Sequence, residues 1–250
     1  MKWSRKVQKF FSREGAESVY EHVSRWTHPL SSKRVLETLD PKKVAELRAR
    51  YPQGPDFPKI NRFADVPYWI RINVERAQDI WLDRTPPLQI LDLGCGAGYF
   101  LYVCKYFGHD VLGLDLDQEQ LFRDTLALLG VERVVSRIDP NVPLPELGRK
   151  FDLVAAHRIC FQRIGGARSG REWTTAHWKF FIDDVRSRFL APGGRLILDF
   201  NPRPDGSSFF TPELRAFFQS QGAHIFRSKA LLAIDPAEQP QFMQIKAGSS

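Results

Sequence analysis

The sequence predicts an α/β fold built on a doubly wound sheet, and three observations predict this class. From residue 89 onward, short apolar runs that suit buried strands alternate with longer segments that suit helices. The stretch QILDLGCGAGYF at residues 89–100 has the order of a strand, a glycine turn and a helix. The next apolar run ends in an acid, Asp115. Together these features indicate parallel strands that are connected by helices.

The glycine turn is the stretch around which the chain is organised. The run Ile90–Leu93 is too short for a helix and has the length of a buried parallel strand. Gly94, Gly96 and Gly98 follow it, and residues 99–107 can continue as a buried helix. Glycines allow backbone N–H groups to approach a ligand closely at the positive end of a helix. The stretch therefore predicts a ligand-binding turn.

The acids around this turn indicate which ligand it binds. Asp115 lies about 20 residues past Gly94, where a carboxylate can accept hydrogen bonds from a ribose. The third glycine of the dinucleotide fingerprint is replaced by Tyr99. Asp92 is a poor neighbour for a pyrophosphate but a good partner for an amino group. A ligand that carries an adenosine and an ammonium group fits these residues better than a dinucleotide.

Two motifs resemble those of a known family. The pattern D-x-G-x-G-x-G over residues 92–98, followed by Asp115, resembles the first motif of the class I S-adenosylmethionine-dependent methyltransferases. The phrase FLAPGGRLILDF at residues 189–200 resembles the same family's region before the fifth strand. The resemblance covers about residues 66–247. It implies a Rossmann-like, seven-stranded, mostly parallel sheet with an antiparallel last pair, and S-adenosylmethionine as the cofactor.

The resemblance also implies which residues bind the cofactor. Asp139 matches the polar or acidic residue that ends the third strand and faces the adenine amino group. Its alternative is a turn acid before Pro140. The cofactor-binding residues expected in this way are Asp92, Gly94, Cys95, Gly96, Gly98, Tyr99, Asp115, Leu116 and Asp139.

The remaining elements follow from apolar periodicity and from turn residues. Helices are expected at Ser18–Trp26, Ser31–Arg50 with a break at Pro41, Val66–Asp83, Leu121–Leu129, Glu172–Leu190 and Pro212–Gln221. Strands are expected at Asp110–Leu114, Arg133–Ile138, Phe151–Ala156, Arg195–Phe200, Ala223–Leu231 and Gln241–Ala247.

The N-terminal residues match no specific family pattern. Residues 1–65 are expected to form a helical extension and a linker, and residues 66–250 the cofactor-binding domain. Trp3, Val7 and Phe10 recur at helical spacing among lysines and arginines, which predicts an amphipathic basic helix. We expect this helix to pack on the domain rather than to contact a membrane surface.

Composition limits the classes of function. The net charge is +7, and residues 1–50 hold twelve Lys and Arg against six Asp and Glu. This segment could bind nucleic acid, an anionic membrane surface or an anionic substrate, but the solvated faces of short helices are the favoured explanation of the charges. No apolar run has the length of a membrane span. Three cysteines without metal-like spacing indicate reduced thiols in a cytoplasmic protein and no metal site.

His157 is the candidate catalytic residue. Methyl transfer from a sulfonium needs mostly alignment and exclusion of water, and no metal or covalent nucleophile is required. If the acceptor is a hydroxyl, a base can remove its proton. His157 directly follows the expected fourth strand and begins the loop 157–172, where substrate contacts are expected. The alternatives are a histidine that only caps the strand, and His177 as the base.

The favoured function is a methyltransferase that acts on a small-molecule acceptor, with an oxygen as the favoured target. The motif that holds amino groups in adenine and glutamine methyltransferases is replaced by AHRI at residues 156–159. Arginines in the loop could bind an anionic substrate or lie on the surface. The alternatives are a nucleic-acid methyltransferase that uses the basic N-terminal segment, a nonenzymatic cofactor-binding module, and an oxidoreductase. Oligomeric state does not follow from the sequence.

Overall fold

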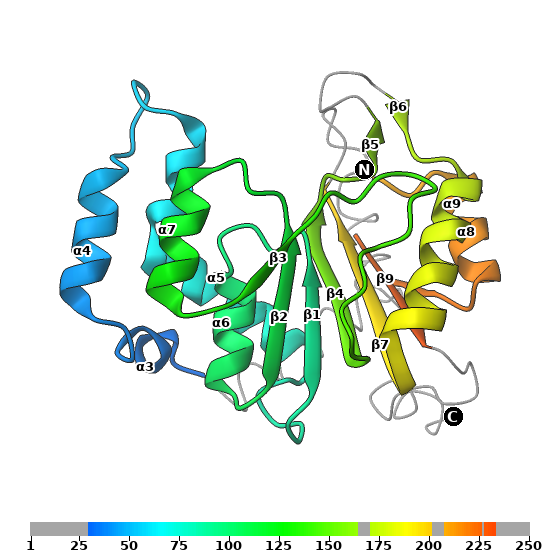
Figure 1. Cartoon of the computed structure of the whole chain (residues 1–250), viewed down its shortest axis with the longest axis horizontal. Coiled ribbons are helices and arrows are strands. Elements are labelled where there is room, and N and C mark those ends of the chain that lie inside the picture. The colour runs from blue at the N-terminus through cyan, green and yellow to red at the C-terminus, as the bar shows by residue number, and fades with distance from the viewer. Residues whose placement is uncertain (1–29, 165–170, 202–207, 227, 234–250) are drawn as a thin grey trace, which may run out of the picture. The chain divides into compact units, whose positions relative to one another are not determined.

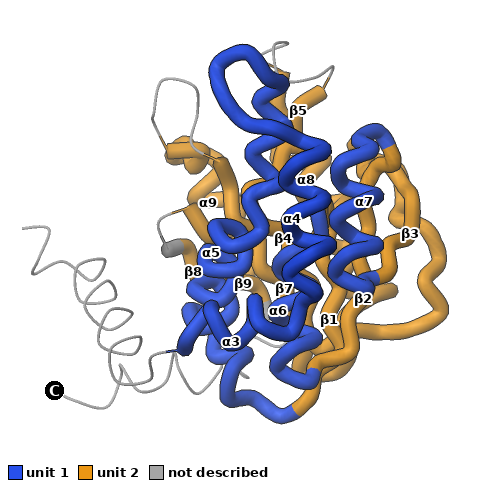
Figure 2. Tube along the Cα trace, turned by 90° about the vertical axis from the view of Figure 1, so that its left-hand side faces the viewer, with its two compact units in different colours: residues 1–86, 97–108, 118–131 blue, residues 87–96, 109–117, 132–250 orange. Residues whose placement is uncertain are grey.

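The computed structural model describes residues 30–164, 171–201, 208–226 and 228–233. These residues form two compact units, which Figure 2 colours separately. Unit 1 holds the described residues up to 86, together with 97–108 and 118–131. Unit 2 holds 87–96, 109–117 and the described residues from 132 onward. The division between an extension at 1–65 and a domain at 66–250 stays a prediction.

Unit 2 is built on a seven-stranded, mostly parallel sheet, as predicted (Figure 1). The strand order is β3-β2-β1-β4-β7-β9-β8. The five parallel strands are β3 (Arg133–Val135), β2 (Asp110–Asp115), β1 (Gln89–Leu93), β4 (Phe151–Ile159) and β7 (Leu190–Phe200). The antiparallel strands β9 (Lys229–Ala233) and β8 (His224–Phe226) complete the edge. The order reverses between β1 and β4, which is where doubly wound sheets bind their ligands.

Aromatic side chains form much of the core of unit 2. Trp178 in α8 (Thr175–Asp184) is fully buried and lies edge-on to Phe200 of β7, with ring centroids 5.4 Å apart. Phe218 in α9 (Pro212–Ser220) packs on the same indole at 5.4 Å. A π-helical turn, η2 (Val185–Phe189), joins α8 to β7. Burying these rings stabilises the packing of α8 and α9 on the sheet.

Unit 1 is helical. Its elements are α3 (Ser32–Leu36), α4 (Pro41–Arg50), the 3-10 helix η1 (Lys59–Ala64), α5 (Val66–Asp79), α6 (Tyr99–Tyr106) and α7 (Gln120–Leu129). Asp40 and Asp65 cap α4 and α5 with their carboxylates, and each helix has a proline in its first turn. The expected break at Pro41 is therefore confirmed as a new helix start.

Several expected boundaries were wrong because strand length depends on the neighbouring strand. The strand expected to end at Ala156 continues to Ile159, because β7 supplies ladder partners that include Asp199 for His157. His157 is therefore in β4 and does not begin the loop. The third strand ends at Val135 and not at Ile138, because β2 ends at Asp115 and offers no further partner.

The segment after β4 also differs from the expectation. Residues 163–164 (β5, Arg163–Ile164) and 171–172 (β6, Arg171–Glu172) form an antiparallel hairpin. The helix expected from Glu172 begins at Thr175, because Glu172 pairs in the hairpin and Thr174 accepts the His177 N–H as the helix cap.

The single strand expected at residues 223–231 was also wrong. The run 223–231 contains a turn at Ser228, so β8 and β9 together form the antiparallel pair. The turn lacks glycine and proline, which explains why the run looked continuous. The strand expected at 241–247 and the helices expected within residues 1–26 lie outside the described residues. Among those described, no helix has the length and hydrophobicity to cross a membrane.

Candidate functional site

The glycine turn follows β1 at the carboxyl edge of the sheet in unit 2. Gly94 and Gly96 have φ angles of 73° and 54°, in the left-handed region that favours glycine. The N–H groups of Gly94 and Cys95 both donate to the carbonyl oxygen of Leu114, at 2.7 and 3.3 Å. The turn is thereby fixed against the end of β2, where the predicted ribose acid lies.

Asp115 ends β2 and joins the turn to the loop that follows. Its Oδ2 accepts the N–H of Gly96 at 2.5 Å, and its Oδ1 accepts the N–H of Leu116 at 2.6 Å. Burial raises the pKa of the Asp115 carboxyl, while these two hydrogen bonds and the charge of Arg133 act in the opposite direction. Because an ionised carboxylate has about four acceptor positions, it can still accept hydrogen bonds from a ligand's hydroxyl groups.

Arg133, at the start of β3, fixes the loop after β2. Its guanidinium donates to the carbonyl oxygen of Leu116 at 2.9 Å and pairs with the carboxylate of Asp117. The side chain is 7% exposed. Leu116 is thus fixed at both its N–H and its C=O, which makes this part of the predicted adenosine site rigid before any ligand binds.

Asp92 and Cys95 are buried beside the glycine turn. Asp92, two residues before Gly94, is 3% exposed, and the residue opposite it in β4 is Ala155. Burial raises the pKa of the Cys95 thiol well above its ordinary value, and the carboxylates of Asp92 and Asp115 raise it further. Cys95 is therefore a neutral, unreactive thiol in this turn.

Asp139 does not end the third strand, as the sequence had predicted. Because β3 ends at Val135, Asp139 is in the segment that follows. Its carboxylate is half exposed and lies 3.9 Å from Nε of Arg137, and its carbonyl oxygen accepts the N–H of Val142. The cofactor role of Asp139 therefore stays a prediction.

Gly98 and Tyr99, at the start of α6, have their contacts in unit 1. Gly98 has a φ of 79°, and a Cβ there would lie 2.5 Å from Leu126 and 2.8 Å from Val131. The hydroxyl of Tyr99 donates to the carbonyl oxygen of Phe63 at 2.7 Å. Burial raises the pKa of this phenol well above its ordinary value. The side chain of Tyr99 is thus occupied, and its backbone N–H remains the group it can offer to a ligand.

His157 and Asp199 face each other across the ladder between β4 and β7. Nδ1 of His157 lies 4.0 Å from Oδ2 of Asp199, and the two side chains are 5% and 4% exposed. Ser228 donates to Oδ1 of Asp199 at 2.6 Å. The sequence analysis named His157 as the candidate base without a partner. Their pairing follows from the ladder register, because both residues end strands that are adjacent in the sheet.

Arg158 has a strained backbone at this edge. Its φ is 52°, which is uncommon for a residue with a side chain, and the ladder between β4 and β7 is irregular here. Asn201 holds it by donating from Nδ2 to the Arg158 carbonyl oxygen at 2.8 Å. The Arg158 guanidinium is half exposed, with Nε 3.5 Å from Oδ2 of Asp199. Strain that is held in this way is typical of functional sites.

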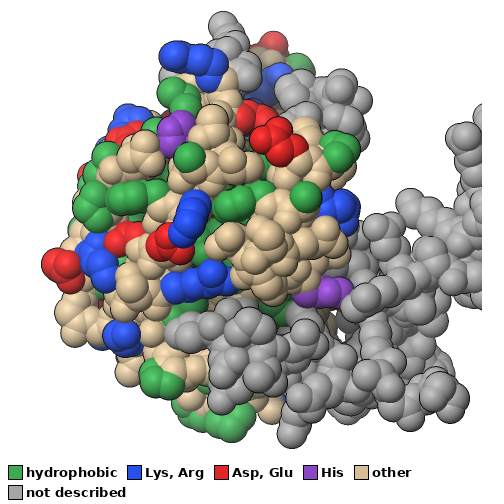
Figure 3. All heavy atoms as spheres, turned by 90° about the vertical axis from the view of Figure 1, so that its right-hand side faces the viewer, with side chains coloured by type: hydrophobic (Ala, Val, Ile, Leu, Met, Phe, Trp, Pro, Cys, Tyr) green, Lys and Arg blue, Asp and Glu red, His purple; other side chains and the backbone are tan. Residues whose placement is uncertain are grey.

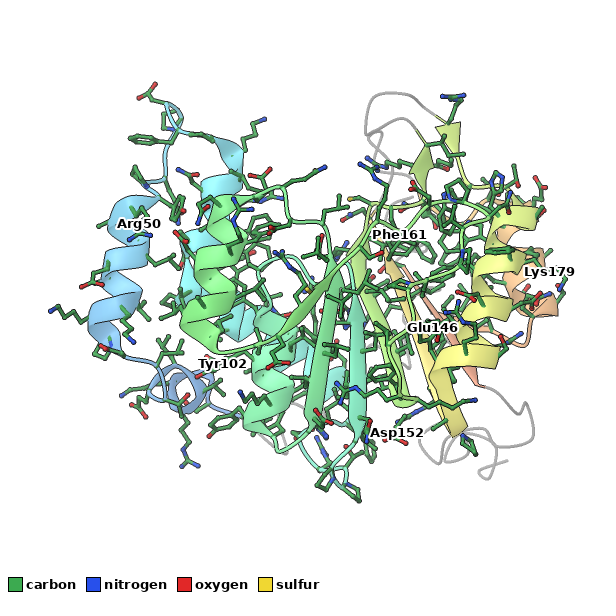
Figure 4. All side chains as sticks on the ribbon, viewed as in Figure 1. Arg50, Tyr102, Glu146, Asp152, Phe161 and Lys179 are labelled. Carbon is green, nitrogen blue, oxygen red and sulfur yellow. The ribbon has the colours of Figure 1, made fainter. Side chains whose placement is uncertain are left out.

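Phe161 lies between the glycine turn and the aromatic core of unit 2. Its Cδ1 is 4.0 Å from the position that a Cβ on Gly94 would occupy. The ring packs on Trp173 and Phe181, with centroids 5.4 and 5.6 Å away. Figure 4 shows Phe161 just beyond one end of β4 and Asp152 at the other end of this strand. The segment after β4 therefore borders the turn that is predicted to bind the cofactor.

The residues at this edge suit S-adenosylmethionine. The described residues hold no group of three or more His, Cys, Asp or Glu side chains that could bind a metal ion. At Gly94, a Cβ would meet nothing closer than Phe161, so the glycine leaves space above the turn. Asp92 offers a buried carboxylate for an ammonium group, and Asp115 offers acceptors for ribose hydroxyls.

A family model described as a methyltransferase domain matches residues 91–165, from β1 to just past β5. Residues 91–165 therefore carry a methyltransferase domain, and their glycine motif resembles that of the class I S-adenosylmethionine-dependent methyltransferases. This family and its cofactor are those that the glycine motif predicted. The matched residues include the turn, Asp115 and His157.

Solved structures of methyltransferases resemble this one. DesVI of Streptomyces venezuelae has 18% sequence identity and a TM-score of 0.47, over 68% of this chain and 97% of that one. CalS10, an amino pentose methyltransferase from Micromonospora echinaspora, has 24% identity and a TM-score of 0.42, over 62% and 61% of the two chains. The glycopeptide N-methyltransferase MtfA has 20% identity and a TM-score of 0.37, over 52% and 54%. No curated protein matches the sequence.

Proposed function

We propose that this methyltransferase acts on a hydroxyl group of a small-molecule acceptor, with His157 as the base. The observation that carries the proposal is the pairing of His157 with Asp199 at the same sheet edge as the glycine turn. Asp92 pairs with Ala155 in the ladder, so His157 lies two residues farther along β4, level with Gly94. A histidine beside a carboxylate is a common arrangement for a general base.

The glycine turn and the acids around it bind and orient the cofactor. Asp115 would accept hydrogen bonds from the ribose hydroxyls, and Asp92 would pair with the ammonium group. When bound, S-adenosylmethionine supplies a methyl group on a positively charged sulfur, which is a good leaving group. The protein then has to align the acceptor oxygen with the methyl carbon and exclude water.

The proton balance gives His157 its role. With the cofactor bound, the acceptor oxygen would form a bond to the methyl carbon as the carbon–sulfur bond breaks, and the electron pair of that bond would remain on the sulfur. The hydroxyl proton goes to a nitrogen of His157, and Asp199 stabilises the imidazolium that forms. Ser228 orients Asp199 through its hydrogen bond to Oδ1.

A small-molecule acceptor is favoured over nucleic acid because the described charges are mixed in sign. Figure 3 shows basic and acidic side chains interspersed on the face of unit 2 that carries α8 and α9. There, Lys179 lies 2.6 Å from Asp183 and Arg188 lies 2.7 Å from Asp184. Nucleic-acid interfaces instead gather unpaired basic residues in one patch or stripe.

Calorimetry with S-adenosylmethionine and S-adenosylhomocysteine tests the cofactor assignment. We expect both to bind, and no binding at millimolar ligand would contradict the assignment. A screen of cofactor consumption with hydroxyl, amine and RNA acceptors then tests the acceptor class. Turnover with RNA and with no small hydroxyl compound would replace this proposal by the nucleic-acid alternative.

Substitutions of the pair test the base. His157→Gln should leave cofactor affinity unchanged and lower the turnover of a hydroxyl acceptor by about a hundredfold or more, since general bases contribute on this order. Asp199→Asn should shift the pH profile of turnover, because the carboxylate that stabilises the imidazolium is removed. A His157→Gln enzyme with the wild-type turnover at every pH would show that the transfer needs no base.

A further inference from the structure

The carboxamide of Gln162 is buried without a hydrogen-bond partner. The residue is 0% exposed, and neither Oε1 nor Nε2 has a partner within the part of the chain that the structure describes. The indole N–H of Trp173 shares this property at 3% exposure, as does that of the fully buried Trp178. Buried polar groups in native proteins are nearly always hydrogen-bonded, so such a cluster needs an explanation.

Gln162 and Trp173 come from facing positions at the base of the β5–β6 hairpin. The backbone N–H of Trp173 donates to the carbonyl oxygen of Gln162 at 2.9 Å, and Arg163 pairs with Glu172 next in the ladder. Residues that face each other in an antiparallel ladder have side chains on the same face. The amide and the indole therefore lie on one face of the hairpin.

The segment that carries Gln162 borders the glycine turn through Phe161. Gln162 directly follows Phe161, whose ring approaches Gly94 in the glycine turn. A glutamine side chain has three rotatable bonds, and this carboxamide has no hydrogen bond to lose when it turns. It can turn toward a bound acceptor and gain hydrogen bonds there, while the ring of Phe161 offers the acceptor an apolar surface.

The chemistry of the cluster selects a neutral polar group. The amide supplies an acceptor oxygen and two N–H donors, and the indole of Trp173 supplies one more donor. The side chains that pack around the indole, Phe161, Trp178 and Phe181, carry no charge. An ionised ligand group would be desolvated here without a counter-charge, whereas a hydroxyl both donates and accepts.

We propose that Gln162, with Trp173, determines acceptor specificity by binding a neutral hydroxyl of an aromatic acceptor beside the glycine turn. This deepens the proposed function and rests on its small-molecule acceptor. The hydroxyl that Gln162 binds need not be the one that is methylated. An amide without a partner in the free protein is retained because the ligand supplies the partner.

A matched pair of ligands and a matched pair of variants test this. The probes are 2-naphthol and 2-methylnaphthalene, which differ by a hydroxyl and a methyl group, and binding is measured by NMR titration of the full chain without cofactor. We expect the wild type to favour 2-naphthol about tenfold, the value of one good hydrogen bond. Gln162→Leu should remove that preference. Gln219→Leu, the same change at an exposed position of α9, should keep it.

The proposal would be overturned if Gln162→Leu preferred 2-naphthol over 2-methylnaphthalene as strongly as the wild type does. It would also be overturned if the wild type bound both probes equally well. The denaturation midpoint gives an independent readout. Gln162→Leu should raise it, because the substitution removes an unpaired buried amide. A lowered midpoint would mean that the amide is already hydrogen-bonded, for example to internal water, and would also overturn the proposal. Failure of the proposed function is distinguishable, because absent cofactor binding would leave the hydroxyl preference measurable.

Discussion

The carboxylate of Asp115 accepts the backbone N–H of Gly96 at 2.5 Å. The acid that ends the second strand therefore fixes the conformation of the turn after the first strand. Its other oxygen accepts the N–H of Leu116 at 2.6 Å, so a single side chain connects the turn, β2 and the loop after β2. Because Asp115 is also the predicted ribose ligand, we expect ligand binding and the shape of the turn to be coupled through this residue.

The first prediction concerns cofactor affinity. Asp115→Ala should weaken the binding of S-adenosylmethionine by about ten- to a hundredfold, because hydrogen bonds to a charged group contribute roughly 1.5–3 kcal/mol. Calorimetry measures this directly. The matched control is Asp110→Ala at the other end of β2, where an exposed carboxylate pairs with Arg149 at 2.6 Å. Exposed pairs contribute little, so an equal loss in both variants would contradict the role of Asp115.

The second prediction is that cofactor affinity depends on the ionisation of Asp115. Burial raises the pKa of this carboxyl above its ordinary value of 3.8 in the free protein. Ribose hydroxyls donate to the ionised form and lower the pKa in the complex, so binding releases a proton. Affinity should therefore fall as the pH drops through the raised pKa. Calorimetry in buffers of different ionisation enthalpy detects the released proton, and Asp115→Asn should abolish it.

The same pKa shift has the opposite sign for stability. Between the ordinary and the raised pKa, the folded protein binds more protons than the unfolded chain. Without cofactor, the contribution of Asp115 to the free energy of unfolding therefore decreases as the pH rises through this window. Denaturant unfolding at several pH values should show a smaller decrease for Asp115→Asn. An identical pH dependence in both proteins would show that the Asp115 pKa is not raised.

The sequence predicted the parts of the site that local signals encode. The run Ile90–Leu93 and the glycines after it show a strand and a turn on their own, and the distance to Asp115 adds the ribose acid. The extension of β4 through His157 could not be predicted, because the partners for those residues come from β7, about 40 residues away in the chain. The burial of Gln162 depends on a hairpin that the sequence analysis read as a loop.

The fourth prediction concerns the packing at Gly98. A Cβ there would lie 2.5 Å from Cδ2 of Leu126 and 2.8 Å from Cγ2 of Val131, at a φ of 79°. Gly98→Ala should therefore lower the free energy of unfolding by roughly 2–5 kcal/mol, the sum of left-handed strain and overpacking. Gly130→Ala is the control, because its φ is 61° and a Cβ there meets nothing within 4 Å.

Urea denaturation of both glycine variants separates the two effects. Gly130→Ala should lower the free energy of unfolding only by the cost of a left-handed backbone, roughly 1–2 kcal/mol. Equal losses at both positions would mean that Leu126 and Val131 move aside without cost, and that Gly98 is required for its backbone conformation alone.

The last prediction concerns the reactivity of the cysteines. Cys95 and Cys104 are buried, and burial raises the pKa of the Cys95 thiol well above its ordinary value. Cys160 is exposed, with Sγ 3.4 Å from Nδ2 of Asn201. Because the thiolate is the reactive form, iodoacetamide should modify the native protein at Cys160 and leave Cys95 and Cys104 intact. Peptide mass spectrometry reads out each site, and unfolding in urea should make all three cysteines react. Rapid modification of Cys95 in the native protein would show that the glycine turn opens to solvent.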